Sequence, residues 1–119
     1  MDIKLFDSEI KVMEAIWKHG EQPAGSLAKL LAEQVGWNRN TTYTVIKKLI
    51  EKGAIERIEP NFVCKPLIRK EQVQRQEADE LIGKLFDGSA ELFLSAYLSG
   101  KRLSQDEIAR LKRLVDKLQ

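Results

Sequence analysis

Apolar residues recur at helical spacing over the first third of the chain. The first stripe begins after Asp7 and Ser8, either of which can cap a helix, and it consists of Ile10, Met13, Ile16 and Trp17. His19 and Gly20 mark its end, because a cation and a glycine both suit the carboxyl end of a helix. A second stripe, running from Ser26 to about Val35, consists of Leu27, Leu30, Leu31 and Val35. The pattern therefore predicts two amphipathic helices joined by a short extended link at Pro23.

A third stripe predicts the most informative helix. Asn38 can cap it, Gly53 ends it, and its buried face consists of Thr42, Val45, Ile46, Leu49 and Ile50. The opposite face consequently lies outside the core. It carries amide, hydroxyl and ammonium groups, which belong to Asn40, Thr41, Tyr43, Thr44, Lys47 and Lys48.

Two short runs of strand-forming residues follow, over residues 54–58 and 62–65, around the turn sequence Glu59–Pro60–Asn61. Cys64 falls in the second run, where we expect a packed thiol. Three helices followed by a hairpin is the order of a winged helix-turn-helix. We therefore expect a mainly α-helical fold with a small β-hairpin, and a first domain over residues 1–69.

Beyond Lys70 the pattern predicts helices alone. One runs to Asp87–Gly88, Ser89 can cap a second that ends at Gly100, and Ser104 opens a third with a capping-box sequence. Three helices over ~50 residues bury too little surface to be stable alone.

We therefore interpret residues 70–119 as a helical dimerisation domain, with packing onto the first domain of the same chain as the alternative. The predicted interface residues are Leu81, Leu85, Leu92, Phe93, Tyr97, Leu111 and Leu114. Within this set, the stripe of Leu92, Phe93 and Tyr97 fits either an ordinary core or a two-fold interface.

Composition excludes several classes of protein. The 119 residues are 43% hydrophobic and 32% charged, which is typical of a folded chain and not of a disordered one. No stretch approaches the ~20 apolar residues of a membrane helix, so we expect a cytoplasmic protein without membrane insertion. One cysteine and one histidine provide no disulfide and no zinc site, and no nucleophile is paired with a base. We expect neither an enzyme nor a cofactor.

The net charge of +2 hides an uneven distribution. Residues 1–37 hold four basic and six acidic side chains, residues 38–69 hold seven basic and three acidic, and residues 70–119 hold nine of each. The basic excess therefore lies on the third helix and the hairpin, where a DNA backbone would lie if that helix entered a major groove.

This placement predicts a division of work among the residues. Short hydrogen-bonding side chains suit base edges, so Thr41, Tyr43 and Thr44 are the predicted base-reading residues, and a threonine methyl favours a half-site that contains thymine. Longer or flanking groups suit phosphates. The predicted phosphate contacts are Arg39, Asn40, Lys47, Lys48 and, from the hairpin, Arg57.

Three blocks of sequence resemble a known family. EIKVMEAIW at residues 9–17, WNRNTTYTV at 37–45 and KLIEKGAI at 48–55 are similar to the penicillinase and methicillin-resistance repressors of bacteria. The likeness extends through DGS at 87–89 and LSQDEI at 103–108. It implies a homodimeric winged-helix transcriptional repressor that binds a palindromic double-stranded operator and silences a target operon, such as one for antibiotic resistance, and its own gene.

The resemblance also implies a release mechanism and shows where this chain departs from the family. In the best-known relatives a membrane-bound metalloprotease sensor triggers cleavage within the dimerisation domain. The matching bond joins Ala96 to Tyr97, where those relatives carry asparagine before an aromatic residue. The turn after Glu59 is shorter than the family's usual wing and lacks an arginine at its tip. The chain also lacks the cysteine cluster of copper-responsive members.

A different class of protein shares the winged-helix architecture. Some winged helices serve only as protein-protein interaction modules and bind no DNA. Such a module would carry an apolar or acidic outer face on its third helix, whereas this face is polar and basic. The sequence therefore favours the repressor.

Overall fold

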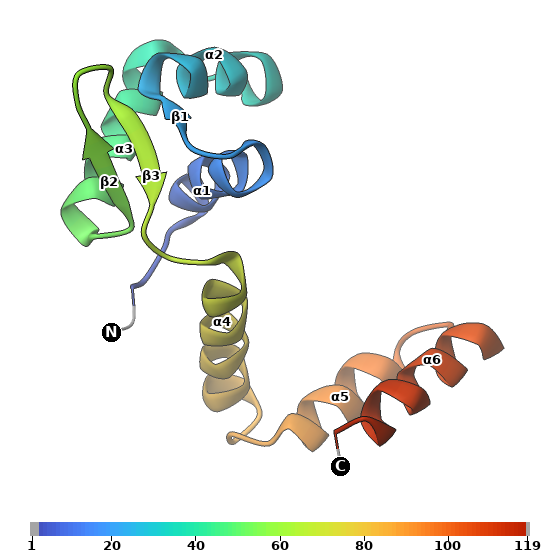
Figure 1. The fold of residues 1–119 in the computed structure, drawn as a ribbon. Coiled ribbons are helices and arrows are strands. Elements are labelled where there is room, and N and C mark those ends of the chain that lie inside the picture. The colour runs from blue at the N-terminus through green and yellow to red at the C-terminus, as the bar shows by residue number, and fades with distance from the viewer. Residues whose placement is uncertain (1–2, 119) are drawn as a thin grey trace. The chain divides into compact units, whose positions relative to one another are not determined.

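The fold is a winged helix followed by a helical unit, as the sequence predicts. We analysed a computed structural model that describes residues 3–118 (Figure 1). The elements are α1 (Asp7–His19), β1 (Gln22–Pro23), α2 (Ala24–Val35), α3 (Arg39–Lys52), β2 (Ile55–Ile58), β3 (Val63–Pro66), α4 (Lys70–Leu85), α5 (Ala90–Ser99) and α6 (Gln105–Asp116). They form two compact units, Met1–Glu77 and Ala78–Gln119.

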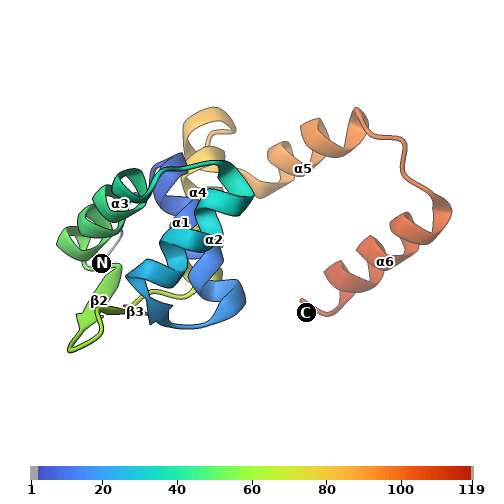
Figure 2. The same ribbon diagram turned by 90° about the horizontal axis from the view of Figure 1, so that it is seen from above.

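The core of the first unit lies among α1, α2, α3 and the sheet. It confirms most of the predicted stripes, because the largest fully buried side chains include Met13, Ile16, Leu27, Leu31, Ile46, Leu49 and Ile55. Val35, the last member of the second stripe, is instead exposed at the end of α2. Ile50, at the edge of the third stripe, is partly buried against this core. The outer face of α3 is left outside the core, and the views in Figures 1 and 2 both show the hairpin beside this helix.

The sheet has three antiparallel strands in the order β1–β3–β2. The sequence predicts only two of them and treats Pro23 as part of a link, whereas Gln22 and Pro23 pair with Cys64 and Val63. Proline is tolerated here because β1 is an edge strand with one side free of ladder bonds. Cys64 therefore lies in the central strand and is fully buried.

The start of α1 differs in detail from the prediction. The helix begins at Asp7, but neither Asp7 nor Ser8 provides the cap, because the cap position is Phe6. The Phe6 amide donates to Glu9 Oε1 at 2.8 Å. Glu9 is buried, and Lys52 Nζ donates to the same oxygen at 2.6 Å. This ion pair ties the amino end of α1 to the last residue of α3.

Both ends of α3 agree with the prediction. Asn38 Oδ1 accepts a hydrogen bond from the Thr41 amide at 2.8 Å, which satisfies one of the free donors of the first turn. Gly53 follows the helix at a φ of 82°, a left-handed conformation that glycine adopts without strain. The helix is thus capped at both ends and held on one face by the core.

The first turns of α4 belong to the first compact unit. The predicted boundary after residue 69 coincides with the start of α4, while the compact unit continues to Glu77. Three contacts explain this continuation: Val73 is buried in the core, Gln76 Nε2 donates to the Ile3 carbonyl at 2.9 Å, and Lys70 pairs with Glu14 at 3.2 Å.

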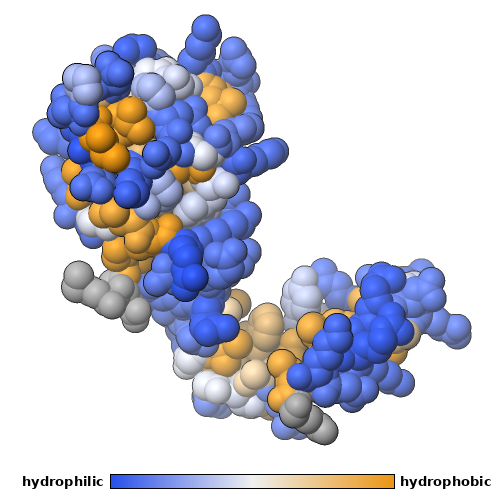
Figure 3. Space-filling view, in the orientation of Figure 1, coloured by the Kyte–Doolittle hydropathy of each residue, from blue (hydrophilic) through white to orange (hydrophobic). Residues whose placement is uncertain are grey.

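The second unit has the predicted helices but little buried surface. Ser89 caps α5 through the Leu92 amide, and Ser104 opens α6 with the predicted capping box. Among the described residues, α5 and α6 contain no fully buried side chain. Figure 3 shows apolar side chains at the surface of this unit.

Candidate nucleic-acid interface

The outer face of α3 presents a central row of polar side chains. Asn40, Thr44 and Lys47 are spaced at i, i+4 and i+7, which places them on one side of a helix, and all three are exposed. Thr41 and Lys48, also exposed, flank this row on one side, while Arg39 and Tyr43 flank it on the other. We call this set of seven residues the α3 face.

Thr41 is partly committed to the helix cap. Its hydroxyl donates to Asn38 Oδ1 at 3.0 Å, beside the bond from its own amide. The hydroxyl proton is therefore in use, and the side chain offers a ligand its acceptor lone pairs and its methyl group. Thr44 has no such commitment among the hydrogen bonds described, so it is the more versatile hydroxyl of the two.

Tyr43 is half-buried and packs toward the hairpin. Its ring meets Phe62 edge-on, with centroids 5.8 Å apart and planes at 73°. Its hydroxyl accepts a hydrogen bond from Arg39 Nη2 at 3.0 Å. Both Arg39 Nη2 and the Tyr43 hydroxyl would lie 3.7 Å from a Cβ added at Gly25, so α2 also approaches this pair. The sequence places Tyr43 on the outer face but does not reveal these partners.

The hairpin contributes one further cation. The Arg57 guanidinium lies 3.7 Å from the centroid of the Phe62 ring, and its Nε donates to the Glu59 carboxylate. The Arg57 side chain is 50% exposed and the Glu59 side chain is 60% exposed. A phosphate that binds Arg57 through Nε therefore has to displace the Glu59 carboxylate.

Phe62 is the site residue that the sequence does not predict. The periodicity places it at the start of a strand, with no indication of a partner. An aromatic residue beside a Pro–Asn turn is a signal that it packs, but its contacts with Tyr43 and Arg57 arise from the tertiary fold. Such contacts between elements have no periodicity to reveal them.

The remaining sequence candidates are structural. Cys64 is buried, and this burial raises the pKa of its thiol to about 11, against a smaller lowering by nearby Arg57. His19 is exposed at the last position of α1, next to Gly20 at a φ of 86°. Over the described part of the chain, no group of three or more histidine, cysteine or acidic residues could hold a metal ion. None of the described helices is long and apolar enough to span a membrane.

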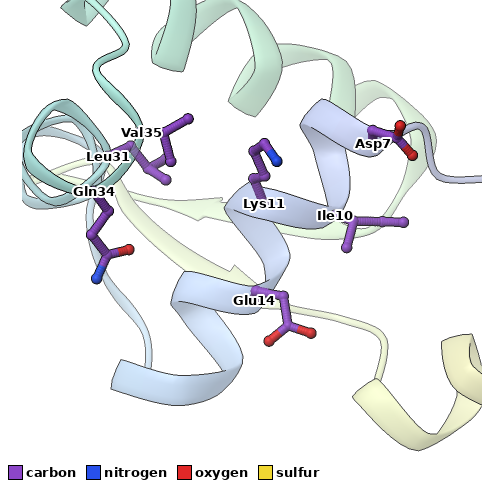
Figure 4. A pocket seen from close by; sticks show the side chains of 7 residues that line it. All are labelled: Asp7, Ile10, Lys11, Glu14, Leu31, Gln34 and Val35. Atoms are coloured by element: carbon purple, nitrogen blue, oxygen red, sulfur yellow. The ribbon is translucent and has the colours of Figure 1, made fainter.

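A surface groove of ≈ 420 Å³ lies between α1 and α2, and its lining suggests no catalytic or metal-binding site (Figure 4). Ile10, Leu31 and Val35 are its apolar members, and Asp7, Lys11, Glu14 and Gln34 complete its lining. It contains no histidine or cysteine and no residue of the α3 face. The α3 face and the hairpin therefore remain the candidate site.

The predicted dimerisation residues lie mostly at the surface of the second unit. Exposed side chains among them are Leu81, Leu85, Leu92, Tyr97 and Leu114, while Phe93 and Leu111 are partly buried. Phe93 stacks on Tyr97 at 5.8 Å between centroids and meets Phe86 edge-on at 5.3 Å. Ala96 and Tyr97 are exposed residues of α5.

Several known proteins resemble this chain. The methicillin resistance regulatory protein MecI of Staphylococcus aureus strain N315 is 27% identical over 122 residues, which cover 98% of this chain and 99% of that protein. The penicillinase repressor of Bacillus licheniformis is 25% identical over 115 residues, which cover 95% of this chain and 90% of that protein.

Two solved structures resemble the first part of the chain. The DNA-binding domain of the repressor BlaI has a TM-score of 0.53 and 32% identity, covering 56% of this chain and 84% of that one. The monomeric form of Bacillus licheniformis BlaI in complex with the blaP half-operator has a TM-score of 0.50 and 31% identity, covering 57% of this chain and 85% of that one. The family model for the penicillinase repressor matches residues 5–117. The chain therefore belongs to the penicillinase repressor family, a family of transcriptional repressors and not of enzymes.

Proposed function

We propose that this chain is a homodimeric transcriptional repressor that binds a palindromic operator through α3, silencing a target operon and its own gene in the cytoplasm. The observation that carries the proposal is the α3 face, an exposed row of hydrogen-bonding side chains on a helix fixed at both ends. None of its seven residues is acidic, because the single acid of the helix is Glu51, which follows the central row, and most of the seven carry polar or basic groups. An apolar or acidic outer face is the one expected of a protein-protein interaction module.

The geometry supports a division between base and phosphate contacts. Thr44 and Asn40 lie in the central row, where a helix in the major groove comes nearest to base edges. We therefore propose Asn40 as a base contact in place of the phosphate contact that the sequence predicts. Lys47 continues the row, and Lys48, Arg39 and Arg57 lie around it with charges that suit phosphates. Thr41 supplies a methyl group that suits the methyl of thymine, which favours half-sites containing A·T pairs.

Dimerisation through the second unit would supply most of the affinity. One DNA-binding unit neutralises few phosphates, so it binds weakly at physiological salt. Two linked units make the second contact intramolecular and raise the affinity without any new kind of contact. The exposed apolar side chains of α4, α5 and α6 support this role, because small units with so little buried surface need a partner.

Separation of the two chains would then relieve repression. We propose that a membrane-bound metalloprotease sensor does so by cleaving the Ala96–Tyr97 bond, in response to an antibiotic. The bond lies in α5, where both side chains are exposed. A protease binds extended backbone, so α5 must open locally before cleavage. Its lack of buried side chains favours such opening.

Two substitutions on the α3 face test DNA binding. Thr44→Ala is expected to change the base preference of the protein in a selection from random duplexes, because it removes a base-reading hydroxyl. Lys48→Ala is expected to weaken selected and random duplexes alike and to reduce the salt slope of binding by about one unit, because it removes a phosphate contact. An unchanged preference for Thr44→Ala, together with an unchanged slope for Lys48→Ala, would exclude α3 as the reading helix.

A further inference from the structure

Four side chains form a continuous series from α3 to the hairpin. Arg39 and Tyr43 come from the first turns of α3, Phe62 from the end of the hairpin turn, and Arg57 from β2. Each member contacts the next one, and the two ends of the series are guanidinium groups. We call Tyr43 and Phe62 the aromatic bridge.

The contacts along this series are short and varied. The Arg39 guanidinium carbon lies 4.9 Å from the Tyr43 centroid, and Arg39 Nη2 donates a hydrogen bond to the Tyr43 hydroxyl. Tyr43 meets Phe62 edge-on, and Phe62 lies under Arg57 at 3.7 Å. Arg39 and Arg57 thus rest on opposite ends of one aromatic pair.

The bridge is itself anchored to the rest of the unit. The Phe62 carbonyl accepts a hydrogen bond from the Ala24 amide at 2.9 Å, which fixes the turn to the start of α2. Phe62 has a φ of 48°, an uncommon conformation for a non-glycine residue that the surrounding fold holds in place. Both rings are partly buried against the core.

Stacking itself occupies no guanidinium donor, and the hydrogen bonds described for these two arginines use only Arg39 Nη2 and Arg57 Nε. A ring contacts the flat face of a guanidinium, while its N–H groups point outward in the plane of the group. Arg39 and Arg57 can therefore rest on the bridge and bind phosphate oxygens at the same time. Holding them in place before DNA arrives lowers the entropy lost on binding.

We propose that Tyr43 and Phe62 are positioning residues that hold Arg39 and Arg57 for two phosphate contacts, and that Tyr43 does not read a base. This inference rests on the proposed DNA-binding function. Tyr43 fits the positioning role because its hydroxyl already accepts from Arg39 and its ring packs against Phe62. Base reading then falls to Thr44 and its neighbours in the central row.

A double-mutant cycle on the full chain tests the part played by Phe62. Duplexes selected by the wild-type protein from a random pool serve as the probe. Phe62→Leu is expected to weaken binding roughly tenfold, the scale of about one charge-assisted hydrogen bond, and to leave the ranking of single base-pair variants unchanged. In an Arg57→Gln background the same change is expected to have a much smaller effect, because Phe62 acts through Arg57.

Tyr43→Phe provides a second variant that keeps the ring and so preserves packing. It is expected to weaken binding only while Arg39 is present, with no further loss in an Arg39→Gln background. Phe6→Leu is the matched control, since Phe6 is an exposed ring that contacts the side chain of Lys52 at the other end of α3, 4.5 Å away. It is expected to leave DNA affinity unchanged.

The outcomes separate the inference from the function on which it rests. Additive losses in both cycles, or a Tyr43→Phe variant with a new base preference, would overturn the positioning role while DNA binding stands. A wild-type protein that selects no duplex and shows no salt-dependent binding would overturn the proposed function and the inference with it. Thermal unfolding of each variant shows whether it is folded. If Phe62→Leu is not folded, the Tyr43→Phe cycle alone tests the positioning role.

Discussion

On the proposed function, Glu59 is the hairpin residue whose charge most directly opposes a phosphate at Arg57. Its carboxylate accepts from Arg57 Nε, and a phosphate that binds this nitrogen has to replace it. Removing the charge with Glu59→Gln is therefore expected to raise affinity for DNA roughly two- to fivefold, the value of an exposed ion pair, and to steepen the salt dependence. Titrations over a range of salt concentrations measure both effects.

Glu56→Gln is the control for this prediction. It makes the same charge change one residue before Arg57, and alternation along a strand directs the two side chains to opposite faces. If Glu56→Gln raises the affinity as much as Glu59→Gln does, the effect comes from net charge. The prediction that Glu59 and a phosphate compete for Arg57 would then be wrong.

Cys64 should make the stability of the first unit sensitive to alkaline pH. Burial raises the pKa of the folded-state thiol to about 11 from an ordinary 9.0, so the folded state holds its proton more tightly than the unfolded state. The resulting stability is fully present below pH 9 and is lost as the pH rises toward 11, by up to about 3 kcal/mol. Urea unfolding of wild type and Cys64→Ala on both sides of this window measures the difference, and a pH-independent difference would contradict the buried thiol.

For single residues, the sequence predicts which side chains are exposed better than it predicts which residues they contact. The outer positions of α3 follow from helical period, because every fourth or third residue repeats the same environment. The use of the Thr41 hydroxyl in the cap and the packing of Tyr43 on Phe62 do not follow from it. The first is a local contact between residues three apart, added to a cap that the sequence does predict. The second joins two elements through the fold, and a single sequence carries no periodic signal for it.

At the scale of elements, α4 determines where the first unit ends, because its first turns pack on that unit. A fragment of residues 1–69 lacks the buried Val73 and the Gln76 contact with the Ile3 carbonyl, whereas a fragment of residues 1–77 retains both. The shorter fragment is expected to be less stable by about 2 kcal/mol, the cost of exposing a valine-sized side chain. Chemical denaturation followed by circular dichroism compares the two, and equal stabilities would show that the first turns of α4 add nothing.

The elements themselves were largely predictable, and the exceptions have physical causes. The helix caps at Asn38, Ser89 and Ser104 are local signals, so the sequence predicts them correctly. β1 has only two residues and contains proline, which hides it from strand propensity, and it exists because β3 offers an edge for pairing. The predicted cap of α1 was wrong because of another contact between elements. Glu9 is buried, pairs with Lys52 of α3 and accepts from the Phe6 amide, which makes Phe6 the cap position.

At the scale of the whole molecule, the two units divide the work of the proposed repressor. The first unit has a closed core and a polar reading face, while the second has capped helices with apolar side chains left at the surface. Length and period predict a division of this kind. The pairing of two chains is a proposal that follows from the surface of the second unit.

The measurement that tests this account most directly is a gel-shift titration of the full chain and of residues 1–77 on a selected duplex with two half-sites. Residues 1–77 form the compact unit that carries the α3 face, and circular dichroism establishes that the fragment is folded. We predict that the full chain binds the duplex far more tightly than the fragment, and that the two bind a single half-site with similar affinity. Equal affinities on the two-half-site duplex would contradict a repressor that depends on pairing through its carboxy-terminal helices.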